Sequence, residues 1–170
     1  FSIAEYLETR FSLVGKTAMV VGYQGNLGPI WVRTLNNVGA KTFVVGMPEI
    51  DVRDISQLER MRYIEPDIIV YNAAIDNPPA SDGDGTDPYR NYENINDVNH
   101  VGFVNVCRVF VPGMIKRGGG VLLPIGSIMG FGAADSSNYD NGWIKPFAYN
   151  ASKAAIRQFA KSETEFNGKH

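Results

Sequence analysis

Four short apolar runs along the chain predict β-strands that are buried on both faces. Each run is dominated by apolar residues, many of them Val or Ile, which is typical of the central strands of a parallel sheet. The runs cover residues 17–21, 41–45, 67–71 and 121–125. Segments with apolar residues at helical spacing follow them, at residues 29–37, 55–64, 93–116 and 147–166. This alternation predicts an α/β fold with a Rossmann-type, doubly wound parallel sheet in a single domain, residues 1–170.

Three stretches depart from this alternation. Pro112 and Gly113 are expected to break the long helix near its end. Only about five residues separate the second strand from residues 50–52, whereas a crossover to a parallel strand needs a dozen or more. Residues 46–50 are therefore either a trimmed loop or the place where a segment is missing, and both alternatives stay open. The polar loop at residues 76–91 is long enough to be either a substrate lid or a solvated excursion.

Composition and charge exclude several classes of function. The 170 residues carry a net charge of −2 and are 44% hydrophobic, which provides no electrostatic basis for binding nucleic acid or an anionic membrane. The single cysteine, Cys107, excludes an internal disulfide and fits a reducing cytoplasm. No apolar run approaches the roughly 18 residues of a membrane span, and the N-terminal residues lack a signal-peptide pattern. The two histidines, His100 and His170, do not suggest a metal site.

A glycine-rich turn follows the first predicted strand directly. Gly22, Gly25 and Gly28 are spaced three apart, and Pro29 suits the first turn of the next helix. Glycines at this spacing permit a tight reversal, close approach of the backbone to a pyrophosphate and close packing of helix on strand. Because the turn lies between a strand and a helix, it predicts a dinucleotide site at the helix N-terminus. A purely structural turn is the alternative.

Candidate chemistry lies at the start of the last helix, where Tyr149 and Lys153 are four residues apart. Residues at this spacing lie on one helix face, one turn apart. A phenol has a reference pKa of about 10, and a nearby cation favours its ionised form. In a dry cleft such a pair supplies a proton donor and acceptor that works near neutral pH. Taken alone, the pair also fits two ordinary neighbours on a helix surface.

Five features in one order resemble the short-chain dehydrogenase/reductase family, and the resemblance extends from Gly15 onward. They are the glycine turn, Asn72-Ala73-Ala74, Asn99, Ser127 and Tyr149-x-x-x-Lys153. The resemblance implies an NAD(P)-dependent oxidoreductase that interconverts a hydroxyl and a carbonyl group, with a homodimer or homotetramer as its assembly.

The resemblance assigns a role to each candidate catalytic residue. Tyr149 is implied to be the acid/base that exchanges a proton with the substrate oxygen. Lys153 is implied to favour the ionised form of that phenol and to bind the nicotinamide ribose. Ser127 would hold the substrate oxygen, and Asn99 would position a water or a backbone group in the proton relay.

The resemblance also implies bound NAD or NADP. The residues implied to hold it are Gly22, Gln24, Gly25, Asn26, Leu27, Gly28, Asp51, Val52, Asn72, Ala73, Ala74, Tyr149 and Lys153. Glu49 is the nearest acidic candidate for the ribose hydroxyls. No Arg or Lys lies in the glycine turn to meet a 2′-phosphate, so NAD is slightly favoured over NADP.

A finer resemblance concerns the substrate. Residues 72–79, residues 127–131 and an insertion containing Tyr139 resemble a subgroup linked to bacterial polysaccharide and flagellin-sugar modification. This implies a sugar or sugar-nucleotide substrate. Ser127 and Tyr149 are 22 residues apart instead of about a dozen, so the insertion must loop out for both to meet one substrate.

Two other functions remain open. A non-catalytic dinucleotide-binding module is expected if the chain ends at His170, because family members continue into a substrate-binding part that is absent from this sequence. The strand at residues 121–125 would then be an open edge of the sheet. A sugar epimerase or dehydratase of the family's extended branch, which shares the Gly-x-x-Gly-x-x-Gly turn, would use the same Tyr and Lys. The residues that favour an oligomer are Val104, Val106, Phe110, Ile156 and Phe159, on several faces of the last two helices.

Overall fold

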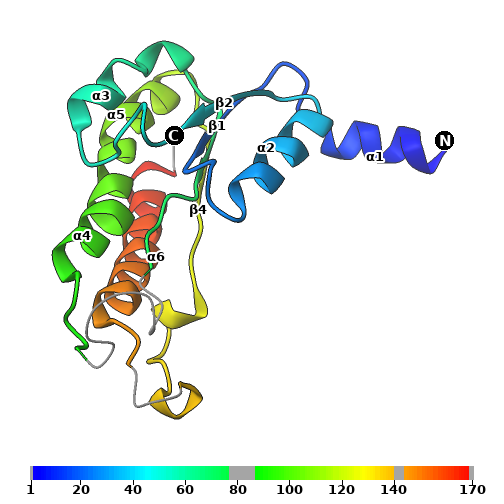
Figure 1. The fold of residues 1–170 in the computed structure, drawn as a ribbon. Helices are drawn as coiled ribbons and strands as arrows, with labels where there is room; N and C mark the ends of the chain where they lie inside the picture. Colours follow the sequence, from blue (N-terminus) through cyan, green and yellow to red (C-terminus); the bar gives the residue numbers. More distant parts are fainter. Residues whose placement is uncertain (1, 77–86, 140–143, 169–170) are drawn as a thin grey trace.

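Four parallel strands form the central sheet of the computed structural model, which describes residues 2–76, 87–139 and 144–168 (Figure 1). The strands are β1 (Thr17–Val21), β2 (Lys41–Val45), β3 (Ile68–Tyr71) and β4 (Val121–Pro124). Their order in the sheet is β2-β1-β3-β4, and every neighbouring pair is parallel. All four strands lie within one residue of the ranges that the apolar runs predict.

Helices cover both faces of this sheet, so the predicted doubly wound α/β fold is confirmed. The α-helices are α1 (Ile3–Phe11), α2 (Gly28–Asn37), α3 (Ile55–Glu59), α4 (Tyr92–Asn96), α5 (Gly102–Lys116) and α6 (Phe147–Asn167). Short 3₁₀ turns are η1 (Arg62–Ile64), η3 (Ile128–Gly130) and η4 (Ser136–Asn138), and η2 (Asp97–Val101) is a π-helical turn. Helix α1 projects away from the sheet (Figure 1).

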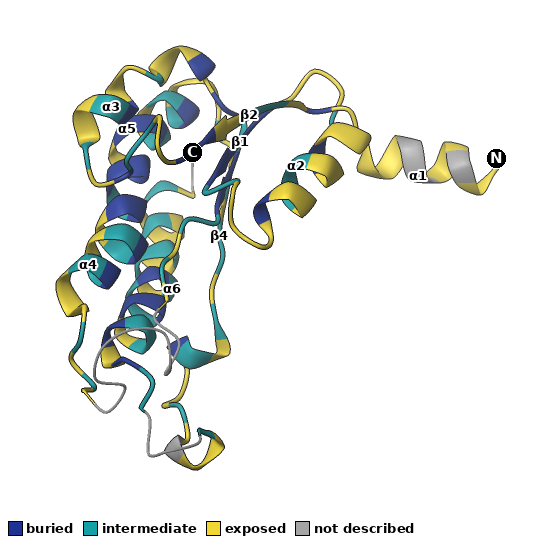
Figure 2. Ribbon diagram, viewed as in Figure 1, coloured by how far each residue is buried: buried dark blue, intermediate teal, exposed yellow. Residues whose placement is uncertain are grey.

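Alternate residues of the strands enter two separate hydrophobic clusters. Met19 and Val21 of β1 belong to the cluster beneath α3, α5 and α6, whereas Ala18 and Val20 belong to the cluster beneath α2. All four side chains are fully buried, as the dark sheet in Figure 2 shows. Because both faces are covered by helices, no polar residue is needed at every second strand position.

Residues 92–116 form one continuous helical path through α4, η2 and α5. The predicted break at Pro112 is wrong, because α5 continues to Lys116. Pro112 and Arg108 are both exposed, so the Arg108 carbonyl that loses its helical donor lies on the side of α5 that faces water. By length and composition alone this helix could cross a membrane, a test that core helices of globular proteins also pass, and half of its apolar window is buried within the domain.

The predicted helix at residues 55–64 is shorter than expected. Helix α3 ends at Glu59, and η1 follows separately. Leu58 and Ile64 are both buried, but six residues at about 100° each would place them on different sides of one helix. The break lets both side chains reach the same core cluster. Residues 50–52 form no strand, which confirms that the short connection is not a crossover.

Strand β4 lies at one edge of the sheet formed by the described residues. Within the described residues it pairs with β3 alone, and Val121 and Leu123 are 55% and 40% exposed. Of the long polar loop, residues 77–86 lie outside the described residues, so the choice between a lid and a solvated excursion stays a prediction.

The residues that favoured an oligomer belong largely to the core of one chain. Val106, Phe110 and Ile156 are at most 3% exposed, and Phe159 packs against the same cluster. The apolar character of these four residues is therefore explained within the single chain, whereas Val104 is only half-buried. The oligomer stays a prediction.

A substitution at Gly102 tests the packing of α5 on the sheet. An added Cβ would lie 2.5 Å from Tyr71 Oη and 2.5 Å from Val52 Cγ2. Tyr71 cannot retreat, because its hydroxyl donates to the carbonyl of Val98 at 2.5 Å and its ring is buried. We expect Gly102→Ala to lower the free energy of unfolding by about 1–3 kcal/mol in urea titrations, although alanine is the better helix former.

Gly132→Ala is the matched control, since a Cβ there would meet nothing within 4 Å. Its effect should stay within about 0.5 kcal/mol. Equal stability of the two variants would show that α5 does not press on Tyr71 and Val52 as described.

Candidate active site

The glycine turn joins the carboxyl ends of β1, β2 and β3. The Gly22 N–H donates to the carbonyl of Val45 at 2.7 Å, and the Asn72 side-chain amide donates to the Gly22 carbonyl at 2.8 Å. Gly22 has φ of +79°, and an added Cβ would lie 2.5 Å from the backbone of Ala73. Both the left-handed conformation and this close approach require glycine.

A cavity of about 500 Å³ opens at these strand ends. This is the edge where open α/β sheets bind ligands, and the volume is in the range of small-molecule sites. Eight of the residues assigned to the cofactor line it: Gly22, Gln24, Gly25, Asp51, Val52, Asn72, Ala73 and Ala74. The structure therefore brings these positions, which are up to 52 residues apart in sequence, around one space.

Gly25 leaves the backbone accessible at the wall of this cavity. An added Cβ would lie 3.4 Å from the Asn72 side-chain nitrogen and 3.5 Å from the Gly22 carbonyl, both of which belong to cavity-lining residues. Gln24 closes the neighbouring wall, because its side-chain amide donates to the carbonyl of Met47 beyond β2. The cavity thus fits a ligand that approaches the backbone closely, as a dinucleotide does.

Asp51 is bound by a neighbour that the sequence reasoning missed. Arg53 donates from Nε to both carboxylate oxygens at 3.0 Å, and from Nη1 to Asn94 Oδ1 at 2.9 Å. The hydrogen bond from Arg53 holds the pKa of Asp51 below its ordinary value, and Asp51 in turn raises the pKa of Arg53. This end of the cavity therefore presents a carboxylate–guanidinium pair instead of a free acid. No sequence signal indicated Asn94, which comes from α4.

Six other residues assigned to the cofactor region do not line the cavity, namely Asn26, Leu27, Gly28, Glu49, Tyr149 and Lys153. Asn26, Leu27 and Glu49 are exposed to solvent. An added Cβ at Gly28 would lie 2.1 Å from the carbonyl oxygen of Tyr23, so this glycine permits close packing within the turn. Contacts of these residues with a cofactor stay predictions.

Lys153 lies one helical turn after Tyr149, near the start of α6. Lys153 is 4% exposed, and its ammonium donates to the carbonyl of Ile125, at the end of β4, at 2.7 Å. The same ammonium lies 5.7 Å from the centroid of the Tyr149 ring. Burial lowers the pKa of Lys153 below its ordinary value, and the carboxylate of Asp76 offsets part of this effect. The predicted pair on one helix face is therefore present, with its cation anchored to the sheet.

The Asn99 side chain is buried and forms hydrogen bonds with backbone groups. It lies in the π-helical turn η2 and is fully buried. Its side chain donates to the Ile75 carbonyl at 3.0 Å and accepts from the Ile75 N–H at 2.8 Å. It also donates to Ser152 Oγ at 3.1 Å, and Ser152 donates to the carbonyl of Tyr149 at 2.8 Å. Asn99 thus fixes both the chain after β3 and the start of α6. The resemblance implied that Asn99 positions a water or a backbone group, but it did not identify Ile75 or Ser152 as the partners.

Ser127 begins η3 just beyond β4. Its hydroxyl accepts from the N–H of Met129 at 3.2 Å. Gly130 packs closely on the backbone of α6 at Lys153, where an added Cβ would lie 2.9 Å from the Lys153 carbonyl oxygen. The insertion therefore leaves Ser127 beside α6, although residues 140–143 lie outside the described residues. A hollow of about 250 Å³ is lined by Ser127, Lys153 and Arg157, among others.

Two charged residues near Tyr149 were also missed. Lys145 Nζ lies 4.6 Å from the centroid of the Tyr149 ring and forms an ion pair with Asp76. These two residues are 69 positions apart, so no local pattern could pair them. In the described part of the chain, no cluster of three or more His, Cys, Asp or Glu side chains could hold a metal ion.

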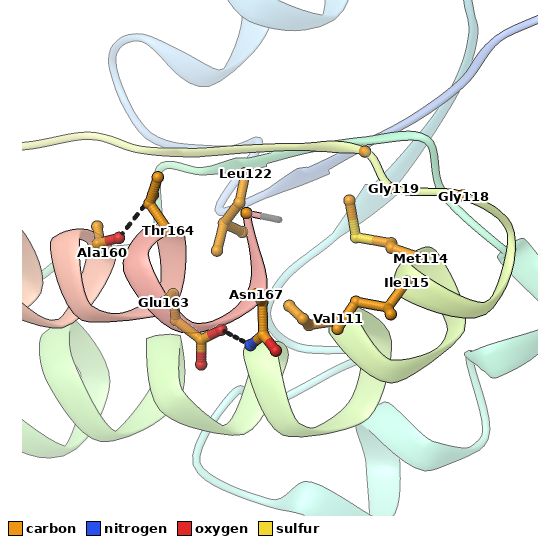
Figure 3. Close-up of a pocket in the computed structure, with 12 residues that line it drawn as sticks. Val111, Met114, Ile115, Gly118, Gly119, Leu122, Ala160, Glu163, Thr164 and Asn167 are labelled. Carbon is orange, nitrogen blue, oxygen red and sulfur yellow. Dashed lines mark hydrogen bonds between the residues drawn. The ribbon is translucent and has the colours of Figure 1, made fainter. Parts of the chain in front are cut away.

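Another pocket, shown in Figure 3, lies between the C-terminal parts of α5 and α6 and strand β4. Its polar groups are paired within the chain, since Asn167 donates to Glu163 at 2.7 Å and Thr164 donates to the Ala160 carbonyl at 3.0 Å. None of the residues assigned to catalysis or cofactor binding lines it. We therefore place the candidate site at the carboxyl ends of the strands.

Similar proteins agree with this fold. Among curated proteins, NADP-dependent 3-hydroxy acid dehydrogenase YdfG of Escherichia coli K12 is 33% identical over 129 residues, which cover 71% of this chain and 47% of that protein. The chain thus spans about half the length of the curated relatives that it matches.

Solved structures show the same fold. The crystal structure of gox2181 has a TM-score of 0.80 at 23% identity, covering 97% of this chain and 71% of that one. A gluconate 5-dehydrogenase from Burkholderia cenocepacia J2315, solved with NADP and tartrate, has a TM-score of 0.73 at 21% identity, covering 93% and 68%.

The family model for short chain dehydrogenases matches residues 49–167, which include Asn99, Ser127, Tyr149 and Lys153. Since the match covers well over half of the sequence, the chain belongs to the short-chain dehydrogenase family.

Proposed function

We propose that this chain supplies the cofactor site and the proton-transfer groups of an NAD(P)-dependent oxidoreductase that interconverts a hydroxyl and a carbonyl group. The observation that carries the proposal is the buried ammonium of Lys153, held against the end of β4 and 5.7 Å from the Tyr149 ring centre. Among the described residues the Lys153 ammonium forms no direct salt bridge, although the Asp76 carboxylate acts on it. A buried lysine of this kind is costly to folding, and such groups cluster at functional sites.

The cavity beside the glycine turn would hold NAD or NADP. Gly22 and Gly25 would lie against the pyrophosphate, Asn72 to Ala74 beside a ribose, and Asp51-Val52 beside the adenine. The cofactor supplies hydride transfer when bound. Names of relatives mention both forms: the YdfG dehydrogenase uses NADP, and one fold relative was solved with NAD. The choice between them stays open.

The chain's own residues would bind the substrate oxygen and move its proton. Ser127 Oγ would donate a hydrogen bond to that oxygen, and Tyr149 Oη would give a proton to it or accept one from it. Lys153 would stabilise the ionised phenol. The hydrogen bond from its ammonium to the Ile125 carbonyl fixes the position of its positive charge. Asn99 would act as a positioning residue, through Ile75 and Ser152.

The substrate would be a small molecule with a secondary hydroxyl or a carbonyl group. A sugar or sugar-nucleotide is one proposed class, favoured by the resemblance of residues 72–79 and 127–131. Hydroxy acids are a second class, since relatives are named as 3-hydroxy acid, serine and gluconate dehydrogenases. An epimerase or dehydratase, which the Gly-x-x-Gly-x-x-Gly turn favours, would convert a sugar without net change in NADH absorbance.

Removal of the Tyr149 hydroxyl is the primary test. We expect Tyr149→Phe in the full polypeptide to lower kcat at least about 100-fold, because the proton donor is lost. Binding of NAD(H), followed by fluorescence, should persist, because the residues that line the cofactor cavity are unchanged. Absorbance at 340 nm with a panel of sugars and hydroxy acids measures turnover. Tyr63→Phe is the control, since Tyr63 is 70% exposed. Full turnover by Tyr149→Phe would contradict the mechanism.

A side chain at Gly25 should block the cofactor without unfolding the protein. The space at Gly25 admits a Cβ at ordinary contact distance, so Gly25→Val should fold, but its methyl groups would occupy the cavity wall. We expect the Kd for NAD(H) to rise at least about tenfold in calorimetric titrations, with an unchanged melting temperature. Gly132→Val, in open space, is the control. Unchanged affinity would place the cofactor elsewhere.

Lys153→Met separates stability from activity. Burial lowers the pKa of Lys153, so keeping this lysine charged costs the folded state stability. The cost is fully present at any pH below the lowered pKa. This cost disappears as the pH rises towards 10.5, the ordinary lysine pKa that applies in the unfolded chain. We expect the variant to lose turnover yet unfold at no lower urea concentration at pH 7, with wild type gaining stability relative to it as the pH rises towards 10.5. Lys116→Met, at an exposed position, should show no such pH trend.

A further inference from the structure

Asp51 is a charged group set among apolar residues in the cavity beside the glycine turn. Ile50, Val52 and Val98 line the same space, and Val52 is buried. The Asp51 side chain keeps 23% of its surface exposed. Apolar walls with a single polar group suit a flat heteroaromatic ring whose edge carries a hydrogen-bonding group. What the carboxylate can select therefore depends on its orientation and on the acceptor capacity that it has left.

Arg53 sets both of these properties. Its backbone N–H donates to Asp51 Oδ1 at 2.9 Å, its Nε lies 3.0 Å from both carboxylate oxygens, and its Nη2 donates to Oδ2 at 2.6 Å. A carboxylate has about four acceptor positions, so these three N–H groups of the described chain leave roughly one. An ionised carboxylate cannot donate, so the remaining position accepts a hydrogen bond from a ligand and repels a carbonyl oxygen.

The guanidinium of Arg53 is itself held in place, although 43% of the side chain is exposed. Its Nη1 donates to Asn94 Oδ1, in α4, at 2.9 Å. The Asn105 side chain, buried in α5, donates to the carbonyls of Val52 and Arg53 at 3.1 and 3.3 Å. Arg53 is therefore tied to α4 through its side chain and to α5 through its backbone, which distinguishes it from a surface arginine that moves freely.

Resting on the proposed function, in which this cavity holds NAD or NADP, we propose that Arg53 is a positioning residue for the base of the dinucleotide. It holds the Asp51 carboxylate so that the carboxylate accepts a hydrogen bond from the exocyclic amino group of a 6-aminopurine. A 6-oxopurine would place a carbonyl oxygen against the same carboxylate and binds less tightly. Through Asn94, this selection depends on α4 as well as on the loop after β2.

Exchange of the base tests this selection. The full polypeptide is titrated in a calorimeter with NADH and with its deaminated analogue, in which hypoxanthine replaces adenine. We expect wild type to bind NADH at least about tenfold more tightly, because the analogue leaves the carboxylate unpaired and opposes it with an oxygen. Asp51→Asn should bring the two Kd values to within about threefold of each other, because an amide can donate to the oxo group.

Arg53→Leu separates positioning from stability. Asp51 stays in this variant but its carboxylate can turn, so the ratio of the two Kd values should fall at least about threefold. Asn94→Ala should lower the ratio in the same direction. The melting temperature should change little, because the ion pair is partly exposed. Arg62→Leu is the matched control, since it removes another exposed, ion-paired arginine that does not line the cavity, and it should leave the ratio unchanged.

Equal binding of NADH and its analogue by wild type would overturn the proposal, and so would an unchanged ratio in Arg53→Leu. If wild type turned over substrate with NADH but did not distinguish the two bases, only the role of Arg53 would be refuted. Selective binding of NADH without turnover of any substrate would refute the proposed reaction alone. Failure of wild type to bind NADH would refute both.

Discussion

The bond between the Lys153 ammonium and the Ile125 carbonyl is the contact on which the arrangement of the site depends. It ties the first turns of α6 to the end of β4, and it holds a buried charge where an apolar side chain would pack at lower cost. A parallel sheet brings the carboxyl ends of all its strands to one edge, so this contact places the start of α6 at that edge, beyond the end of β4. The fold thereby buries a charged group, at a cost in stability, at the position where the proposed proton transfer would require it.

Asparagine side chains connect the remaining parts of this edge. The Asn72 amide links β3 to the glycine turn after β1, and Asn99 links the chain beyond β3 to α6. Each amide can donate and accept, so it can satisfy backbone groups where no regular strand continues. Asn99 can reach Ile75 from within η2, where the backbone departs from the α-helical pattern, and such π-turns are frequent at functional sites.

The sequence predicted the strands, the Tyr149–Lys153 pair and the glycine turn because each depends on local spacing. It did not predict η2 or the separation of α3 from η1, since both are set by which side chains the core must bury. Nor could it pair Lys145 with Asp76, which are distant in sequence and meet only after the sheet has formed. Local patterns therefore define the elements here, whereas contacts between strand-end loops define the surroundings of the phenol.

The three glycines of the turn also show why a motif does not assign one role to every member. Gly22 is required by its positive φ and by the nearby backbone of Ala73, and Gly28 by the carbonyl of Tyr23. Only at Gly25 would a side chain fit within the folded turn and still enter the cavity wall. Loss of Gly22 or Gly28 would disturb the fold and thereby the site, whereas loss of Gly25 affects the ligand space directly. Of the three, Gly25 is therefore the position that separates dinucleotide binding from a purely structural turn.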